Sequence, residues 1–400
     1  PKPSELAPLL QFSLPTLRRK KRRLEQAYTI WDLRDIAKRR TPKGPFDYTD
    51  GSAESEVSLE RARQAFRDLE FIPSILKDVS TADLTRKTLG ETFAMPVGIA
   101  PTGFTRMMQT QGEIAGARAA EKYGIPFTLS TLGTTTIEKV VESAPTGANW
   151  FQLYMWKDRE GSMALVERAK NAGVKTLMLT VDVPVAGQRT RDYRNGLTVP
   201  PRLTAGTILN AIPKPAWWMN FLTTPPIEFA SMKNWEGTVG ELLDYMFDPT
   251  MTWEDLKWIR QQWDGNLIVK GIQNLEDGKK AAEIGADAIL LSNHGGRQLD
   301  RAPVMLHLLS DIKKEFKKDF EIHIDTGIMH GADVLAAMAL GAQYAYVGRA
   351  YLYGLMAGGQ DGVEKALEIM RTQMIRNMKL LGVATLDELQ PRHVRLLNRQ

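Results

Sequence analysis

The sequence predicts a (β/α)8 barrel, the TIM fold, for most of its 400 residues. Three observations lead to this prediction. Short apolar runs recur along the chain, stretches of helical period follow them, and the apolar runs do not alternate with polar residues. Strand and helix signals in strict alternation are typical of a parallel sheet. Strands buried on both faces read as continuous apolar runs, and eight of them suit a closed barrel.

The predicted strands occupy, in order, residues 94–100, 126–130, 150–153, 176–181, 266–270, 286–292, 321–325 and 344–347. Helical periodicity falls between them, most clearly over residues 112–123, 162–172, 253–263, 275–284 and 331–340. The rhythm breaks once, after the fourth strand, where the connection far exceeds the roughly 12–15 residues of an ordinary loop. This inserted segment, about 185–250, contains Trp217, Trp218, Phe221 and Trp235. Aromatic residues at that density favour a lid over a linker.

Residues 1–45 read as a basic N-terminal extension, ahead of a barrel domain at residues 46–400. The run RRKKRR at 18–23 is either a solvated stretch or a contact with anionic lipid head groups. No apolar run is long enough to span a membrane, and no signal peptide is recognisable. We therefore expect a cytoplasmic protein, with a peripheral position on the inner face of the cell membrane as an option.

Composition excludes several classes of protein. With 43% hydrophobic and 25% charged residues the chain can build a full core, so a disordered protein is excluded. There is no Cys, and no two of the five His lie at i, i+4, so no metal site is predicted. A formal net charge of +5, with both signs mixed along the chain, gives no reason to expect a nucleic-acid partner.

Polar residues gather where the predicted strands end, which is where barrels of this kind carry their chemistry. The residues at these strand ends, polar ones and their neighbours together, are Ala100, Pro101, Thr102, Gly103, Ser130, Gln152, Tyr154, Thr180, Asp182, Lys270, Ser292, His294, Arg297, Asp325, Gly327, Gly348 and Arg349, with Arg189 just beyond. Charged groups are costly to bury unless they are used or paired. The loops after strands seven and eight commonly hold a phosphate at a helix N-terminus. Gly327, Gly348 and Arg349 therefore predict a phosphorylated ligand.

Several motifs resemble the FMN-dependent α-hydroxy-acid dehydrogenase and oxidase family. The most specific is SNHGGRQLD at 292–300, with LIVKG at 267–271 upstream. The other matches are IAPTG at 99–103, FQLY at 151–154, TVDVP at 180–184 and VGR at 347–349. The resemblance runs from about Phe46 to His393 and is greatest to the L-lactate dehydrogenases that pass electrons to a quinone or cytochrome. It implies an FMN cofactor and oxidation of an L-2-hydroxy acid, foremost L-lactate to pyruvate.

The resemblance also implies roles for the substrate site. His294 would be the base that removes the hydroxyl proton, with Asp182 as its electrostatic partner. Arg189 and Arg297 would bind the substrate carboxylate, because a guanidinium offers a planar bidentate fork. The hydroxyl groups that would bond the same substrate belong to Tyr48 and Tyr154, and Tyr154 would assist catalysis.

For the cofactor, the resemblance places Lys270 near the flavin N1–C2 edge, where a fixed cation raises the reduction potential. The other implied FMN contacts are Ala100, Pro101, Thr102, Gly103, Ser130, Gln152, Thr180, Ser292, Asp325, Gly327, Gly348 and Arg349. Three positions depart from the family: Ser52 replaces a Gly, Leu132 stands where some relatives have a larger residue, and Met329 replaces the usual phosphate-binding Arg. Leu132 fits a short aliphatic substrate. Met329 leaves the phosphate to Arg349 and backbone amides.

Two alternative functions remain open at this point: an oxidase or monooxygenase that uses O2, and a non-catalytic barrel that binds a phosphorylated ligand. Lactate oxidases often have Ala at the position of Gly103, although a glycine needed for close backbone approach explains it equally. Trp217, Trp218 and Phe221 would hold the enzyme at an anionic membrane and favour a quinone, or would cover the active site or a subunit interface. The relatives suggest a homotetramer.

Overall fold

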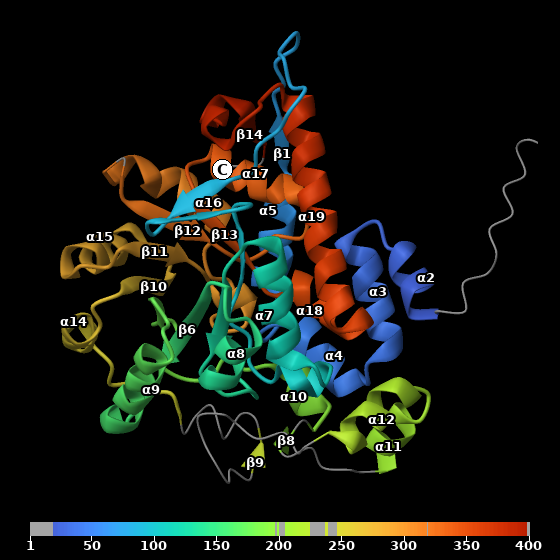
Figure 1. Ribbon diagram of the computed structural model, residues 1–400. Coiled ribbons are helices and arrows are strands. Elements are labelled where there is room, and N and C mark those ends of the chain that lie inside the picture. The colour runs from blue at the N-terminus through green and yellow to red at the C-terminus, as the bar shows by residue number, and fades with distance from the viewer. Residues whose placement is uncertain are drawn as a thin grey trace, which may run out of the picture.

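Eight parallel strands close into a barrel in the computed structural model of the chain (Figure 1). The strands are β4 (Val97–Ile99), β5 (Phe127–Ser130), β6 (Asn149–Tyr154), β7 (Thr176–Thr180), β10 (Asn266–Ile272), β11 (Ala288–Leu291), β12 (Glu321–Ile324) and β13 (Tyr344–Val347). Pairing follows sequence order, and β13 pairs with β4 to close the ring. The predicted barrel and all its strands are confirmed, with ends that differ by a few residues.

The structure describes residues 19–196, 198–199, 205–224, 237–238, 246–317 and 319–397. Of the residues that the sequence analysis singled out, Arg18 and Trp235 lie outside these ranges. Much of the inserted segment at 185–250 also lies outside them.

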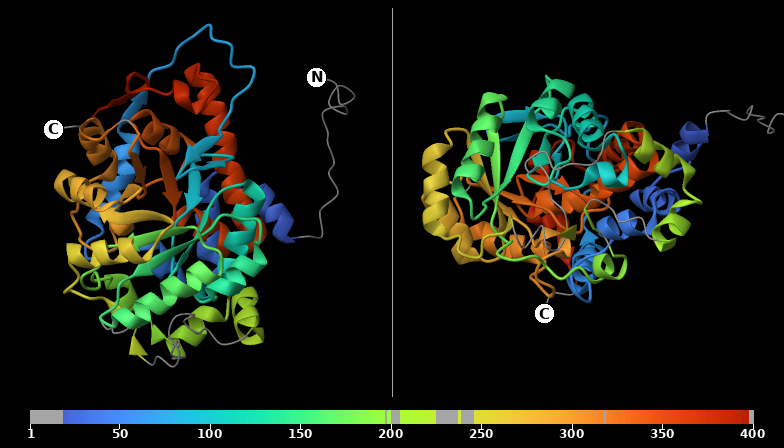
Figure 2. Two further views of the ribbon diagram at one scale, coloured as in Figure 1. Left: turned by 60° about the vertical axis from the view of Figure 1, so that its left-hand side comes forward. Right: turned by 90° about the horizontal axis from the view of Figure 1, so that it is seen from below.

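A helix follows each strand and packs outside the barrel, as the view from below in Figure 2 shows. In order they are α7 (Gly112–Tyr123), α8 (Ile137–Ser143), α9 (Arg159–Asn171), α14 (Trp253–Gln262), α15 (Leu275–Ile284), α16 (Met305–Ile312), α17 (Gly331–Ala339) and α18 (Arg349–Gly358). Their starts and stops follow local chemistry. For example, Thr252 and Asp255 form a capping box on α14, and Gly124 in the left-handed conformation ends α7.

The barrel interior is a packed core and leaves one end for a site. Trp150, Met178, Ile268 and Leu290 point inward and are buried. A hairpin of β2 (Arg86–Thr88) and β3 (Glu91–Phe93) covers the amino-terminal end of the strands. There the Phe93 ring contacts Trp150 at the start of β6, with ring centroids 6.0 Å apart. Only the carboxyl end of the barrel therefore offers loops for chemistry.

The N-terminal helices pack on the barrel rather than standing apart from it. They are α2 (Arg19–Glu25), α3 (Ile30–Arg40), α4 (Lys43–Asp50) and α5 (Val57–Arg67). Leu24, Ile30 and Leu33 are buried in the main core, where α3 and α4 both contact α18. The long helix α19 (Gln360–Leu381) packs on α17 and α18. The expected boundary near residue 45 therefore does not coincide with a change in packing.

The inserted segment contains short elements: α10 (Thr190–Arg194), β8 (Thr198–Val199), α11 (Ala205–Ala211), α12 (Pro215–Thr223) and β9 (Gly237–Thr238). β8 and β9 pair as an antiparallel ladder. α11 and α12 lie at the bottom right of Figure 1, below α4. At the other end of the molecule, β1 (Leu69–Phe71) pairs with β14 (Val394–Leu396), so segments far apart in sequence lie together.

Candidate active site

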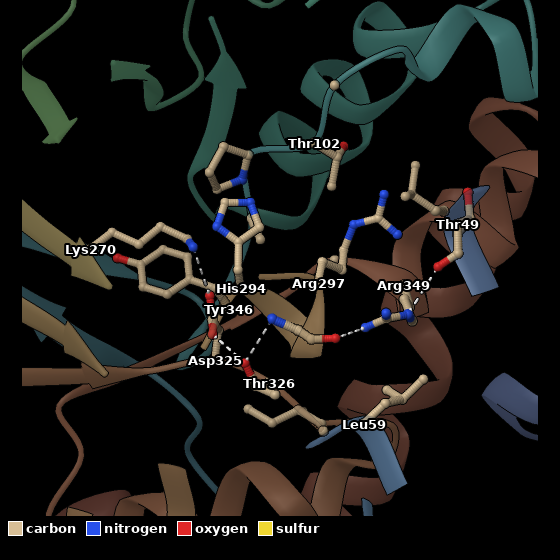
Figure 3. A pocket seen from close by; sticks show the side chains of 18 of the residues that line it. Thr49, Leu59, Thr102, Lys270, His294, Arg297, Asp325, Thr326, Tyr346 and Arg349 are labelled. Atoms are coloured by element: carbon tan, nitrogen blue, oxygen red, sulfur yellow. Dashed lines mark hydrogen bonds and ion pairs between the residues drawn. The ribbon is translucent and has the colours of Figure 1, made fainter. Parts of the chain in front are cut away.

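The carboxyl ends of the barrel strands surround one cavity (Figure 3). The predicted site residues that line it are Tyr48, Ala100, Pro101, Thr102, Gly103, Tyr154, Arg189, Lys270, His294, Arg297, Asp325, Gly327, Gly348 and Arg349. Figure 3 shows Lys270, His294, Arg297 and Arg349 around the same space. The other five predicted residues lie just behind this lining: Ser130, Gln152, Thr180, Asp182 and Ser292.

Strand register explains why these side chains meet. Ser130 pairs with Gln152, and Thr180 pairs with both Tyr154 and Lys270. The Ser130 hydroxyl donates to Gln152 Oε1 at 3.1 Å, and Gln152 Nε2 donates to Thr180 Oγ1 at 3.0 Å. All three polar side chains are buried. This hydrogen-bonded row gives the cavity a rigid wall, because each buried polar group has a partner.

His294 lies between an acid and a phenol. Its Nδ1 is 3.1 Å from Asp182 Oδ1, and its Nε2 is 3.3 Å from the Tyr154 hydroxyl. An ionised carboxylate only accepts hydrogen bonds, so Nδ1 carries the proton and Nε2 is left with its lone pair. His294 also has φ +59, a conformation that a non-glycine residue adopts only where its surroundings hold it. The imidazole is therefore held with an unprotonated Nε2, which is the form that a general base requires.

Burial sets the protonation states of this group. Burial and then the nearby Lys270 charge lower the pKa of His294, against the opposing effect of Asp182. Burial alone would raise the pKa of Asp182, but the His294 and Lys270 charges outweigh it and lower that pKa. Burial and the Asp182 charge raise the pKa of Tyr154 well above its usual value. At neutral pH the site thus holds an ionised acid, a neutral imidazole and a protonated phenol.

Two arginines flank Tyr48 in the cavity. The Arg297 and Arg189 guanidinium carbons lie 4.6 and 5.7 Å from the centroid of the Tyr48 ring. Arg297 also donates to the carbonyls of Tyr48 and Gly51. Burial and the neighbouring Arg189 charge lower the pKa of Arg297. Two cations at one place, Arg189 buried and Arg297 half-buried, favour binding of an anion.

Lys270 lies at the other side of His294 and is 4% exposed. Its Nζ donates to Ser292 Oγ at 3.1 Å and lies 3.7 Å from Asp325 Oδ2. The Thr326 hydroxyl donates to Asp325 and accepts from the Gly295 amide, which joins the loops after β11 and β12. A cation held in this way provides fixed positive charge without being free to move.

Several lining residues were missed by sequence reasoning. They are Thr49, Leu59, Arg63, Phe247, Ile328, Tyr346 and Leu352. Thr49, Leu59 and Arg63 come from α4 and α5, which precede the barrel, and Phe247 follows the inserted segment. Strand-end position located the predicted site residues except Tyr48, which rests on the family resemblance, and these four residues have no strand-end signal. Arg191, two residues after Arg189, forms ion pairs with Asp50 and Glu56.

The residues present fit FMN. Two cationic groups that line the cavity have buried nitrogens with no hydrogen-bond partner in the described part of the chain: Nε of Arg189, and Nε and Nη2 of Arg63. Gly348 leaves open space, since a Cβ there would have no atom closer than 3.8 Å. The N-terminus of α18 follows it without a side-chain cap, as an anion site requires. Across the described ranges, no three His, Asp or Glu side chains are arranged to hold a metal.

Fold and site together define a class of protein, the FMN-dependent oxidoreductases that act on CH–OH groups. A family model described as FMN-dependent dehydrogenase matches residues 37–396. The chain belongs to that family, which confirms the resemblance stated from the sequence.

Individual relatives agree with this assignment. A Mycobacterium tuberculosis protein provisionally named L-lactate dehydrogenase is 59% identical over 399 residues, covering 100% of this chain and 96% of that protein. The L-lactate dehydrogenase of Vibrio cholerae is 40% identical over 365 residues, covering 90% and 96%. Among solved structures, the monotopic membrane protein (S)-mandelate dehydrogenase superposes with a TM-score of 0.88 at 35% identity, covering 93% of this chain and all of that one.

Proposed function

We propose that this protein oxidises L-lactate, an L-2-hydroxy acid, to pyruvate with FMN as cofactor. One observation carries the proposal. His294 Nε2 is unprotonated, because Nδ1 donates its proton to ionised Asp182, and the imidazole lines the same cavity as Arg189 and Arg297. The names of the Mycobacterium and Vibrio relatives support L-lactate. Buried Leu132 and Phe247 in the lining support a short aliphatic substrate.

Each residue has a chemical task in this proposal. Arg189 and Arg297 bind the substrate carboxylate, and Tyr48 and Tyr154 bond its oxygens. His294 Nε2 accepts the hydroxyl proton, and Asp182 stabilises the imidazolium that forms. FMN, when bound, supplies the two-electron oxidant. Lys270 would supply positive charge to the flavin, and the residues from Ala100 to Gly103 and the Ser130–Gln152–Thr180 row would hold the cofactor.

Anaerobic addition of L-lactate to the FMN-loaded protein tests this function. We expect the oxidised flavin absorbance to bleach with L-lactate and to persist with D-lactate. The non-catalytic alternative predicts that neither isomer bleaches a flavin that dithionite still reduces. That result would overturn the proposal.

For the electron acceptor, we propose a quinone in the inner face of the cell membrane. Among the described side chains of α11, α12 and the turn between them, Leu209, Ile212, Met219 and Leu222 are exposed and apolar. Trp217, which the sequence suggested as a membrane anchor, instead donates its indole N–H to the Met107 carbonyl at 3.0 Å. We therefore propose that these four exposed apolar side chains, rather than Trp217, hold the protein at the membrane. The structural relative described as a monotopic membrane protein supports this proposal. No helix within the described ranges is long and apolar enough to cross a membrane.

Sedimentation with anionic vesicles at low salt tests the membrane contact. We expect wild type and the control Leu380→Ser, at a similarly exposed apolar residue of α19, to sediment, and Met219→Ser/Leu222→Ser to remain in solution. Wild type in the supernatant would count against membrane contact.

Faster reoxidation of the reduced flavin by O2 than by a soluble quinone would favour the oxidase alternative. The homotetramer is part of the proposal, and analytical ultracentrifugation checks it.

A further inference from the structure

The phosphate end of the cavity lacks one expected cation. Met329, buried and apolar, lines the cavity at the position where the family usually has an arginine. A phosphate dianion needs charged donors, and a thioether is only a weak acceptor. Either the site binds phosphate with fewer cations, or another residue supplies the missing one.

Arg349 is already engaged by the chain. Its Nε donates to the Thr49 carbonyl at 2.9 Å, its Nη1 to the Gly295 carbonyl at 2.9 Å and its Nη2 to the Gly51 carbonyl at 2.6 Å. All three nitrogens of the guanidinium thus hold neighbouring loops in place. Burial, together with the neighbouring Arg297 and Arg63 charges, lowers the pKa of Arg349 to about 9. Arg349 contributes positive charge to this end of the cavity, but its guanidinium nitrogens already donate hydrogen bonds to backbone carbonyls of the protein.

Arg63 approaches the same end from outside the barrel. It lies one turn after Leu59 on α5, and both side chains line the cavity. Figure 3 shows Leu59 on the side of Arg349, away from Lys270. α5 contacts the loop after β12 directly, because a Cβ on Gly327 would lie 2.8 Å from the Ala62 carbonyl oxygen. The helix therefore brings Arg63 to the glycine of the predicted phosphate loop.

The Arg63 guanidinium is held in place, but two of its nitrogens find no hydrogen-bond acceptor within the described ranges. Its central carbon lies 5.0 Å from the centroid of the Trp31 ring, a cation–π contact that fixes its plane. Its Nε and Nη2 are buried and have no hydrogen-bond partner among the residues that the structure describes. A buried donor without an acceptor has lost its hydrogen bonds to water, so an anion that accepts from these nitrogens would stabilise the group.

We propose that Arg63 supplies the second guanidinium of the phosphate site and thereby sets the preference for FMN over riboflavin, replacing the arginine absent at Met329. The inference rests on the proposed function only in taking FMN as the ligand. Nε and Nη2 are the side-on pair of a guanidinium, which can bind two phosphate oxygens at once. The position of the cation has moved from the loop after β12 to helix α5.

Flavin affinity measured by ultrafiltration of the loaded protein tests the proposal. Arg63→Met should weaken FMN binding about 10- to 100-fold, because charge-assisted hydrogen bonds to the phosphate are lost. Riboflavin, which has no phosphate, should bind within about twofold of wild type, and its retention also reports that the variant is folded. Arg61→Met, an exposed change on the same helix, should leave both affinities unchanged.

A compensating variant adds a second readout. Met329→Arg in the Arg63→Met background should restore FMN affinity by returning the cation to the family's usual position. Equal loss of FMN and riboflavin affinity, or unchanged FMN affinity in Arg63→Met, would overturn the role of Arg63. Failure of L-lactate to reduce a normally bound flavin would instead overturn the proposed function, so the two failures are distinguishable.

Discussion

At the residue scale, the charge state of His294 is the property on which the proposed reaction depends. A base must be unprotonated before it reacts, and burial with Lys270 provides this by lowering the pKa of His294. In the proposed reaction His294 would then take a proton, and Asp182 at 3.1 Å would stabilise the imidazolium. Burial and Lys270 thus favour the neutral imidazole before the proposed proton transfer, and Asp182 favours the imidazolium after it.

His294→Ala should keep FMN bound and slow reduction of the flavin by L-lactate by at least about 10²–10⁴-fold, the usual contribution of a positioned base. Stopped-flow absorbance measures the reduction, and the flavin-to-protein ratio is the control. Near-normal reduction in this variant would show that another group takes the proton.

The pH profile of kcat/KM should follow the lowered pKa of His294. The base is active when deprotonated, so activity falls as pH decreases through that pKa, and the acidic limb should lie below the ordinary histidine value of about 6.5. Asp182→Asn should move the limb to still lower pH, because it removes the charge that raises the pKa. A limb that moves to higher pH in Asp182→Asn would contradict the assignment.

Arg297→Lys should raise KM for L-lactate strongly while the charge is kept, because one ammonium cannot reproduce a bidentate contact with a carboxylate. Arg194→Lys makes the same change at an exposed residue of α10 and should leave KM unaltered. Equal steady-state constants for wild type and Arg297→Lys would remove Arg297 from the substrate site.

At the scale of elements, the barrel strands could be predicted because burial on both faces leaves only apolar residues, as in Leu177, Met178 and Leu179 of β7. Polar side chains that interrupt such runs, like Lys270, then point to the site. The β2–β3 hairpin could not be predicted in this way, because strands of three residues carry too little periodicity. Arg63 was missed for a related reason: on an ordinary surface helix an arginine is expected to face solvent.

Gly103 lies in the loop between β4 and α6 (Thr105–Met108), where close packing leaves no room for a side chain. A Cβ would lie 2.8 Å from Leu132 Cβ and 3.2 Å from its carbonyl oxygen, which accepts from the Phe104 amide at 3.1 Å. Close packing therefore explains this glycine without reference to the acceptor.

Gly103→Ala should lower stability by about 1–3 kcal/mol, the usual cost of overpacking, through displacement of this loop. Thermal unfolding of the FMN-loaded protein measures it, and Gly103→Ser should cost at least as much. An unchanged Tm for Gly103→Ala would show that Leu132 can move aside freely.

At the scale of the whole molecule, the N-terminal helices are part of one core with the barrel. Leu33→Ala should lower the unfolding free energy by about 2–5 kcal/mol, because Leu33 is fully buried. Tyr28→Ala, at a residue 76% exposed, is the matched control in the same segment. If α3 were an independent appendage, Leu33→Ala would instead produce a separate early transition and leave unfolding of the flavin-loaded barrel unchanged.

The closure of β13 onto β4 also has a consequence for biosynthesis. Ala345 of β13 pairs with Val97 of β4. The last strand of the barrel is therefore synthesised long after the first. At about 5–20 residues per second, translating the roughly 250 residues between them takes on the order of 12–50 s. During that time the nascent chain carries β4 with an open hydrogen-bonding edge. Its ribosome-bound form is therefore exposed to aggregation, and we expect a holding chaperone to matter more for its yield than for that of a protein built from local hairpins.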